Sequence, residues 1–198
     1  MKDIIPLLRD SGAMLEGHFL LSSGRHSDRY FQCARLFQYP DRSAEALAET
    51  ASRIKADMAS GKLKIDMVAG PAMGGIIAAY ELGRQLGVPA VFTERDDKGV
   101  MRLRRFDINP GTRILIAEDA VTTGKSCGEC AKALEEAGAV IAALACIVDR
   151  RLPGQDIPWP FYPAVKVDAG NWDPADCHLC RQGIPAVKPG SRKHQPGS

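Results

Sequence analysis

Residues 113–126 read Arg-Ile-Leu-Ile-Ala-Glu-Asp-Ala-Val-Thr-Thr-Gly-Lys-Ser, and this segment says most about the architecture of the chain. Its four consecutive apolar residues, Ile114 to Ala117, predict a strand that is buried on both faces of a sheet. Two acids, Glu118 and Asp119, stand where this strand should end, and a Thr-Thr-Gly turn then leads into a helical pattern. The segment therefore predicts a strand, a short loop and a helix in direct succession, as in α/β folds.

The loop between this strand and this helix suits a phosphate that is attached to a ribose. A helix N-terminus and free backbone N–H groups attract phosphate, and Thr122, Thr123 and Ser126 can add hydroxyl donors. Glu118 and Asp119 would repel a phosphate, so we expect them to accept hydrogen bonds from sugar hydroxyls or to oppose positive charge on the sugar. Considered alone, the segment also fits an ordinary strand-to-helix connection.

Residues 118–126 resemble the phosphoribosyl-diphosphate (PRPP) loop of the type I phosphoribosyltransferases, and they do not follow the Walker pattern G-x-x-x-x-G-K-[ST]. The resemblance implies an α/β fold with a central, mainly parallel sheet flanked by helices, an N-terminal hood and a flexible basic hairpin loop. It also implies that PRPP is bound by Glu118, Asp119, Ala120, Val121, Thr122, Thr123, Gly124, Lys125 and Ser126.

The length and composition of the chain agree with one such domain over residues 1–198. The chain is 45% apolar and 25% charged, and its net charge of +2 is too small to indicate a nucleic-acid partner. It has no run of 18 apolar residues, and Arg9 and Asp10 follow the first residues too closely for a signal peptide. We therefore expect a cytoplasmic protein with neither a nucleic-acid nor a membrane partner.

Strands and helices are predicted to alternate through the middle of the chain. The expected strands cover residues 65–69, 88–93, 114–117 and 140–148, and the expected helices cover 41–60, a segment ending at 86, and 126–137. Asp41 is the expected cap of the first of these helices. Before them we expect a substrate hood over about residues 1–40, with a helix over 3–15 and a loop or hairpin over 17–33. A loose tail is expected over about residues 183–198.

Parallel strands would bring three separate motifs to one edge of the sheet. Gly70-Pro71, Glu118-Asp119 and Asp149-Arg150 each follow a predicted strand. Ligands of such sheets bind beyond the carboxyl ends of the strands. The convergence of the three motifs is stronger evidence for a binding site than any one motif alone.

The glycine-rich turn Gly70-Pro71-Ala72-Met73-Gly74-Gly75 would let backbone approach a second anion closely. In phosphoribosyltransferases the matching loop holds the pyrophosphate, so the resemblance assigns Met73 and Gly74 to PRPP binding and implies a cis peptide at Ala72–Met73. An ordinary glycine-rich turn is the alternative.

A basic segment, residues 95–105, is expected to form a hairpin or mobile loop. It contains Arg95, Lys98, Arg102, Arg104 and Arg105 without interleaved aromatic residues that could stack on bases. A solvated hairpin is one interpretation. Beside a diphosphate site, the better interpretation is that the basic side chains neutralise a leaving pyrophosphate, and we expect Arg95 and Lys98 to contact PRPP.

The N-terminal segment 19–31 resembles the substrate loop of orotate phosphoribosyltransferases, and residues 177–191 resemble a shorter bacterial and archaeal branch of that family. The resemblance covers about residues 10–192. It implies that orotate is bound by Tyr30, Phe31, Thr122 and Arg150. Arginine can bind the orotate carboxylate with two hydrogen bonds, whereas core packing is the alternative role for the two aromatic residues.

Two features depart from the familiar members of that family. They carry a lysine where this chain has Gly74, and a histidine before a glycine in the catalytic loop. This chain instead has Glu94-Arg-Asp-Asp-Lys-Gly99, which contains no histidine. The shorter branch shares this form of the loop, so we do not interpret it as loss of activity.

The function implied by the resemblance is the transfer of ribose 5-phosphate from PRPP to orotate in pyrimidine synthesis. Glu118, Asp119 and Lys98 are the expected catalytic residues. Mg²⁺ is expected to arrive on the diphosphate and to need few protein ligands, and a homodimer is the expected assembly. The alternatives are a phosphoribosyltransferase for a purine or another base, and a non-catalytic regulator that senses PRPP.

The six cysteines include two C-x-x-C pairs, Cys127/Cys130 and Cys177/Cys180. Together they could form a four-cysteine zinc site, but a long segment of patterned α/β sequence separates them. The histidines show no metal-binding spacing, and His26 is expected at the surface, although its place in the orotate loop would also let it contact substrate. The sequence therefore predicts no metal held by protein ligands.

Overall fold

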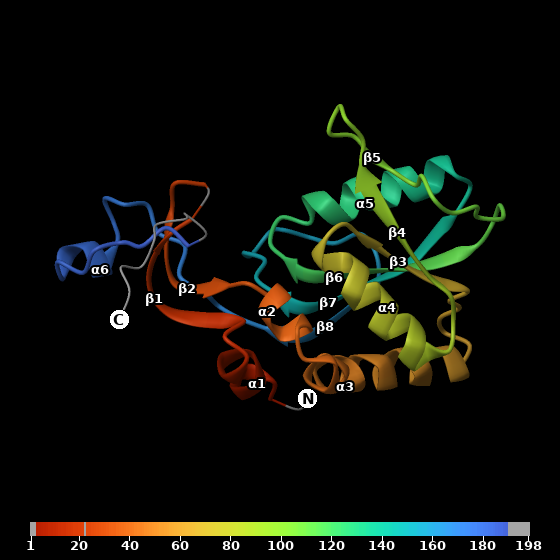
Figure 1. Ribbon diagram of the computed structural model, residues 1–198, viewed down its shortest axis with the longest axis horizontal. Helices are drawn as coiled ribbons and strands as arrows, with labels where there is room; N and C mark the ends of the chain where they lie inside the picture. Colours follow the sequence, from red (N-terminus) through yellow and green to blue (C-terminus); the bar gives the residue numbers. More distant parts are fainter. Residues whose placement is uncertain (1–2, 22, 190–198) are drawn as a thin grey trace.

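The computed structural model describes residues 3–21 and 23–189, and a six-stranded sheet forms the body of the protein (Figure 1). The strand order is β5-β4-β3-β6-β7-β8. The strands are β3 (Met67–Pro71), β4 (Ala90–Arg95), β5 (Met101–Arg102), β6 (Arg113–Val121), β7 (Val140–Asp149) and β8 (Phe161–Lys166). All neighbours pair in parallel except β5, which runs antiparallel to β4. The predicted mainly parallel sheet is confirmed.

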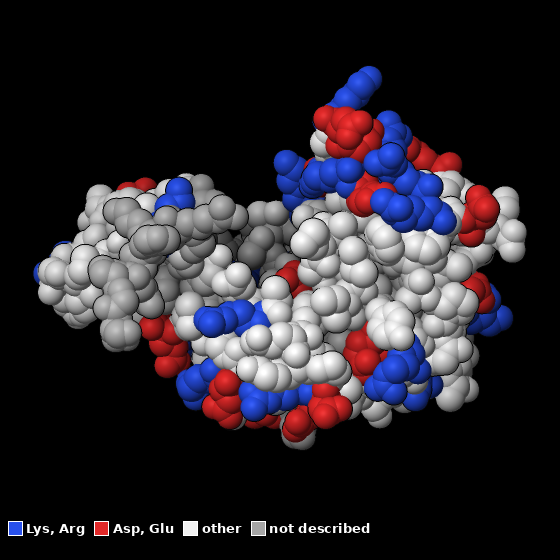
Figure 2. Space-filling model, viewed as in Figure 1, with Lys and Arg blue, Asp and Glu red and all other residues white. Residues whose placement is uncertain are grey.

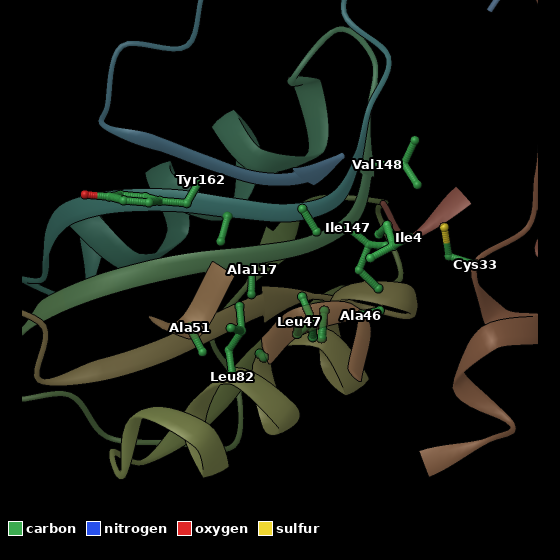
Figure 3. Packing of buried hydrophobic residues seen from close by; sticks show 14 of the residues in the cluster. Ile4, Cys33, Ala46, Leu47, Ala51, Leu82, Ala117, Ile147, Val148 and Tyr162 are labelled. Carbon is green, nitrogen blue, oxygen red and sulfur yellow. The ribbon is translucent and has the colours of Figure 1, made fainter. Parts of the chain in front are cut away.

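Helices cover both faces of the sheet. Alternate residues of the buried strands point to opposite sides, so both faces carry apolar side chains that need a covering layer. On β6, Leu115 and Ala117 pack toward α3 (Pro40–Ala59) and α4 (Gly74–Leu86), whereas Ile114 and Ile116 pack toward α5 (Lys125–Glu136). Figure 3 shows the first of these cores, where Ala117 lies near Leu47 and Leu82 of the two helices.

Several element boundaries differ from the expectation. Helix α3 begins at Pro40, and Tyr39 occupies its N-cap position. The expected cap, Asp41, lies in the first turn of the helix instead. The N-terminal helix α1 (Ile5–Asp10) is shorter than expected, because Met14 already belongs to strand β1. Strand β8 and the four-residue helices α2 (Ala34–Phe37) and α6 (His178–Arg181) were not predicted.

The expected hood is a smaller lobe beside the sheet, and both ends of the chain build it (Figure 1). The N-terminal part is an antiparallel hairpin of β1 (Met14–Leu20) and β2 (His26–Phe31). The C-terminal part adds along both strands: Val187 N donates to His18 O at 2.8 Å, and Trp172 and His26 exchange two backbone hydrogen bonds of 2.9 Å. The tail is thus held to β1 at Val187. The last residues of the expected loose tail, 190–198, lie outside the described residues.

No helix in the described part of the chain has both the length and the apolar character that crossing a membrane requires.

Candidate active site

Three loops meet at the carboxyl edge of the sheet, as the sequence predicted. Residues 72 and 73 follow β3, residues 122–124 follow β6 and Arg150 follows β7. Gly70-Pro71 and Glu118-Asp119 were expected just after their strands but are part of them, because the pairing of β6 with β7 continues as far as Val121. The strands are in register such that Val121 of β6 lies opposite Asp149 of β7. Arg150 N then donates to Val121 O at 2.8 Å, which fixes the arginine beside the β6 loop.

The β6–α5 loop forms a small cradle with a cavity of about 50 Å³, lined by Glu118, Ala120, Val121, Thr122, Thr123, Gly124, Lys125, Ser126 and Cys127. Gly124 caps α5 with a left-handed backbone (φ 73°), a conformation that favours glycine. The cradle therefore combines the positive end of a helix with hydroxyl donors, which is the arrangement that binds a phosphate group.

The two acids at the end of β6 point to different sides of the sheet. Glu118 is buried on the α5 side, and its Oε1 accepts a hydrogen bond of 3.1 Å from Asp119 N. Burial, together with the nearby charge of Asp119, raises the pKa of Glu118 well above that of an exposed carboxyl. The half-buried Asp119 accepts a 2.7 Å hydrogen bond from Ala120 N through Oδ1. The site thus offers carboxylate oxygens beside the phosphate cradle.

The glycine-rich loop lies against these acids. The Ala72–Met73 peptide is cis, as expected, and Ala72 N donates to Thr93 O at 2.7 Å. A Cβ atom on Gly70 would lie 2.0 Å from Gly75 O, so only glycine allows the loop to fold back on itself at this position. The loop is therefore packed tightly against itself and against Ala117 of β6.

A larger cavity of about 560 Å³ lies between the hood and the sheet edge. Its lining includes residues 20, 21 and 23, Arg25 and Tyr30 from the hood, Thr122 and Thr123 from the phosphate loop, Arg150, residues 152 and 155, and Ala169, Asn171, Lys188 and Pro189 from the C-terminal part. Three of the predicted orotate residues, Tyr30, Thr122 and Arg150, are thus brought together. The fourth, Phe31, instead packs under the Arg150 guanidinium, whose Cζ lies 5.0 Å from the ring centroid.

Arg150 is the unusual charge in this cavity. Its Nε is buried and has no hydrogen-bond partner among the described residues. Burial also lowers the pKa of the Arg150 guanidinium. The adjacent Arg151, by contrast, binds the buried Asp149 carboxylate with hydrogen bonds of 2.9 and 3.1 Å. Because it is costly to desolvate a cation that forms no ion pair among the described residues, Arg150 marks a place for an anionic group.

This geometry agrees with the relatives of the chain. Residues 38–173 match the family described as "Phosphoribosyl transferase domain". The chain belongs to the phosphoribosyltransferase family. A curated relative from Heliobacterium modesticaldum, named orotate phosphoribosyltransferase, is 46% identical over 190 residues, which cover 96% of this chain and 97% of the relative.

Solved structures place this phosphoribosyltransferase in the same fold. The orotate phosphoribosyltransferase of Aeropyrum pernix is 25% identical, with a TM-score of 0.70 over 83% of this chain and 94% of that one. The enzyme of Mycobacterium tuberculosis in complex with inorganic phosphate is 23% identical, with a TM-score of 0.63 over 81% of this chain and 92% of that one, a likeness of fold.

Sequence reasoning missed part of the hood wall of this phosphoribosyltransferase. Arg25 lines the large cavity, and its Nε and Nη2 donate to the side-chain and backbone oxygens of Asn171, both at 2.6 Å. Arg25 lies within the segment that resembles an orotate loop, but Asn171 is distant in sequence and carries no local signal. The pair joins the two halves of the hood at the mouth of the cavity.

The basic hairpin of the phosphoribosyltransferase lies away from both cavities. Figure 2 shows its Lys and Arg side chains gathered over β4, β5 and the adjacent edge of α5. Arg95 donates to Gly99 O at 2.7 Å and pairs with Glu129 of α5, and Arg105 pairs with Glu94 at 3.0 Å. In the described structure neither Arg95 nor the exposed Lys98 lines the phosphate cradle or the larger cavity. The predicted hairpin is confirmed, and the structure does not place these two residues at the PRPP loop.

The two C-x-x-C pairs differ in their surroundings. Cys127 and Cys130 lie on the buried face of α5 and pack in the core. The expectation that His26 lies at the surface is wrong: His18 and His26 are both buried, and they lie against Cys177 and Cys180. The C-x-x-C spacing of Cys177 and Cys180 was the sequence feature that could have indicated this cluster. The two histidines that complete it come from a hairpin at the other end of the chain.

Proposed function

We propose that this phosphoribosyltransferase transfers ribose 5-phosphate from PRPP to orotate, giving orotidine 5'-phosphate and pyrophosphate in de novo UMP synthesis. The observation that carries the proposal is Arg150, a half-buried residue whose buried Nε has no partner among the described residues and which lines a cavity that adjoins the phosphate cradle. Orotate carries a carboxylate, and arginine binds carboxylates with two parallel hydrogen bonds. The 46% identical relative named orotate phosphoribosyltransferase supports the same acceptor.

The roles of the site residues follow from their positions. Thr122, Thr123 and the backbone up to Ser126 bind the 5'-phosphate, and Tyr30 lies against the orotate ring. Orotate N1 displaces pyrophosphate at ribose C1, through a transition state with oxocarbenium character. Glu118 and Asp119 form hydrogen bonds with the ribose hydroxyls, and the charge of the Asp119 carboxylate favours the positive ribosyl centre.

The pyrophosphate is expected at the 72–75 turn, where Met73 and Gly74 present backbone to it. The basic hairpin then moves toward the site, so that Arg95 exchanges Glu129 for the pyrophosphate and Lys98 acts in catalysis. An exposed ion pair such as Arg95–Glu129 contributes little stability, and this exchange is therefore inexpensive.

We also propose Mg²⁺ as the cofactor, carried by the diphosphate. The half-buried Asp119 carboxylate beside the cradle supplies the hard oxygen donors that Mg²⁺ prefers, so the residues present fit the ion. When bound, the ion neutralises charge on the diphosphate.

A homodimer is the proposed assembly. Met73, Ile77 and Tyr80 form an apolar row on α4 at helical spacing, and Met73 and Tyr80 are 83% and 67% exposed. The row begins at the glycine-rich loop, so a partner seated on it would lie close to the active site. The cytoplasm is the proposed location, since none of the six cysteines is in a disulfide, as expected in a reducing compartment.

A steady-state assay with PRPP and Mg²⁺ tests the function, with pyrophosphate release measured for orotate, adenine, guanine, hypoxanthine and uracil in parallel. We expect turnover with orotate and no comparable turnover with the other bases. If the protein instead preferred a purine or uracil, that base and not orotate would be the acceptor, and the proposal would be wrong. A regulator would instead bind PRPP without turnover and bind nucleic acid in a salt-dependent titration.

A further inference from the structure

Four side chains of the hood converge on a single point that the proposed reaction does not use. They are His18 of β1, His26 of β2, and Cys177 and Cys180 at the start of α6. Their Nε2, Nδ1 and two Sγ atoms all lie within 4.8 Å of one another. His18, His26 and Cys177 are buried, and Cys180 is exposed at the rim.

The separations match those between the ligands of a tetrahedral zinc ion. His18 Nε2 lies 2.8 Å from His26 Nδ1 and 3.4 Å from Cys177 Sγ, and Cys180 Sγ lies 3.3 Å from His26 Nδ1 and 3.9 Å from His18 Nε2. With Zn–N near 2.05 Å and Zn–S near 2.3 Å, tetrahedral angles place neighbouring ligand atoms about 3.3 to 3.8 Å apart. Each of these four separations is within about half an ångström of that range, and all four ligand atoms lie within 4.8 Å of one another, so small side-chain adjustments would centre an ion.

The surroundings also orient a ligand lone pair into the cluster. His18 Nδ1 lies 2.7 Å from Ile184 O, and because a carbonyl can only accept, Nδ1 must carry the proton. A neutral His18 then directs the lone pair of Nε2 at the other three residues. A backbone carbonyl that fixes the tautomer in this way is the usual outer partner of a zinc-bound histidine.

We propose that His18, His26, Cys177 and Cys180 bind one zinc ion, which fastens the two halves of the hood together. Four protein ligands leave no open position, so the ion is structural. Helix α6 has little hydrophobic packing to hold it in place, since none of its four residues is buried. Segments with little apolar core commonly depend on a metal or a disulfide for order. This inference does not depend on the identity of the acceptor base.

Metal analysis of untagged protein, purified without chelator, tests the proposal. We expect about one zinc per chain in the wild type and a loss of nearly all of it in the Cys177→Ser/Cys180→Ser variant. Cys130→Ala is the matched control, because it changes the other C-x-x-C pair and should keep its zinc. Full zinc in the double variant, or loss in the control alone, would place the metal elsewhere and overturn the proposal.

Cobalt substitution of the wild type keeps the test independent of how the variants fold. Zinc-depleted full-length protein titrated with Co²⁺ should develop the intense visible bands of a tetrahedral site and thiolate-to-cobalt charge-transfer bands, saturating at one equivalent. Zinc should then displace the cobalt and raise the thermal midpoint. Absence of both zinc and these bands would mean that the four side chains form a metal-free hydrogen-bonded cluster, with the His26 Nδ1 proton shared with His18.

Discussion

Gly74 and the carboxylate of Asp119 lie so close together that no side chain fits between them. A Cβ atom on Gly74 would stand 2.4 Å from Asp119 Oδ2, well inside van der Waals contact. The familiar orotate enzymes carry a lysine at the matching position. In this chain the glycine lets the loop and the acid share the space, so a lysine here would have to displace Asp119.

Replacing Gly74 by alanine should therefore impair catalysis more than folding. The new methyl group pushes Asp119 from its position, and a shift of about 1 Å at a catalytic group can cost on the order of 100-fold in rate. We expect kcat/KM for PRPP to fall by about that factor, measured by pyrophosphate release. The control is Gly128→Ala on α5, where an added Cβ meets nothing within 4 Å. Equal activities in the two variants would contradict the steric argument.

The adjacent Arg150 and Arg151 should respond oppositely to the same substitution. Arg150→Met removes a guanidinium whose buried Nε is unpartnered, so we expect no loss of unfolding free energy and a rise in the KM for orotate of about 10- to 100-fold, the usual cost of a charged hydrogen bond. Arg151→Met leaves the buried Asp149 carboxylate unpaired and should cost about 3 kcal/mol of stability. Urea denaturation and orotate titration of both variants measure the two effects. Destabilisation by Arg150→Met alone would show that Arg150 has a structural role.

Glu118 should make the protein less stable as the pH rises. Its pKa is raised in the folded state, so the folded protein keeps this proton at pH values where the unfolded chain has released it. The stabilising effect is fully present below the ordinary carboxyl pKa and is lost as the pH rises through the folded value. Glu118→Gln should gain stability relative to the wild type between about pH 5 and 8, by up to about 1.4 kcal/mol per pH unit.

Denaturant midpoints at several pH values measure this gain. Glu135→Gln, an exposed change on α5, corrects for the general effect of removing one carboxylate. Parallel stability curves for the wild type and Glu118→Gln would exclude a raised pKa at this position.

Mixing two inactive variants should restore activity if the basic loop serves the neighbouring subunit of the proposed dimer. Lys98→Ala has an intact PRPP loop, and Asp119→Asn has an intact hairpin. Half of the randomly reassorted dimers are mixed, and each has one complete site, so we expect about one quarter of wild-type activity. Asp119→Asn mixed with the double variant Asp119→Asn/Lys98→Ala is the control and should stay inactive. No recovery in the first mixture would mean that each loop serves its own subunit.

The donor site could be predicted from the sequence because its parts are contiguous. Glu118 to Ser126 encode the strand end, the acids and the helix start within a few residues, and Gly124 marks the one left-handed turn that the loop needs. The local pattern therefore decides the local structure.

Strand β8 escaped prediction because Pro163 interrupts its pattern. It lies at the edge of the sheet, where only one side of the backbone must pair, and a proline is tolerated there. The alternation of buried Tyr162 and Ala164 with less buried neighbours was present but too short to stand out.

The hood could be predicted only in part, for a different physical reason. A hairpin over residues 17–33 is a local event, but the partners of His18 and His26 arrive with residues 172–187. Nothing near the histidines in sequence indicates that they are buried. Contacts between distant segments are decided by the completed sheet, which brings the two ends together.

The two-part hood sets an order on biosynthesis. His18 leaves the ribosome 166 residues before Ile184, the residue whose carbonyl orients it. At ordinary rates of translation this delay is on the order of ten seconds. All strands of the sheet and the β6 loop are synthesised within that interval, so a nascent chain can complete its donor site while the wall of its acceptor site still lacks the residues that the C-terminal part contributes.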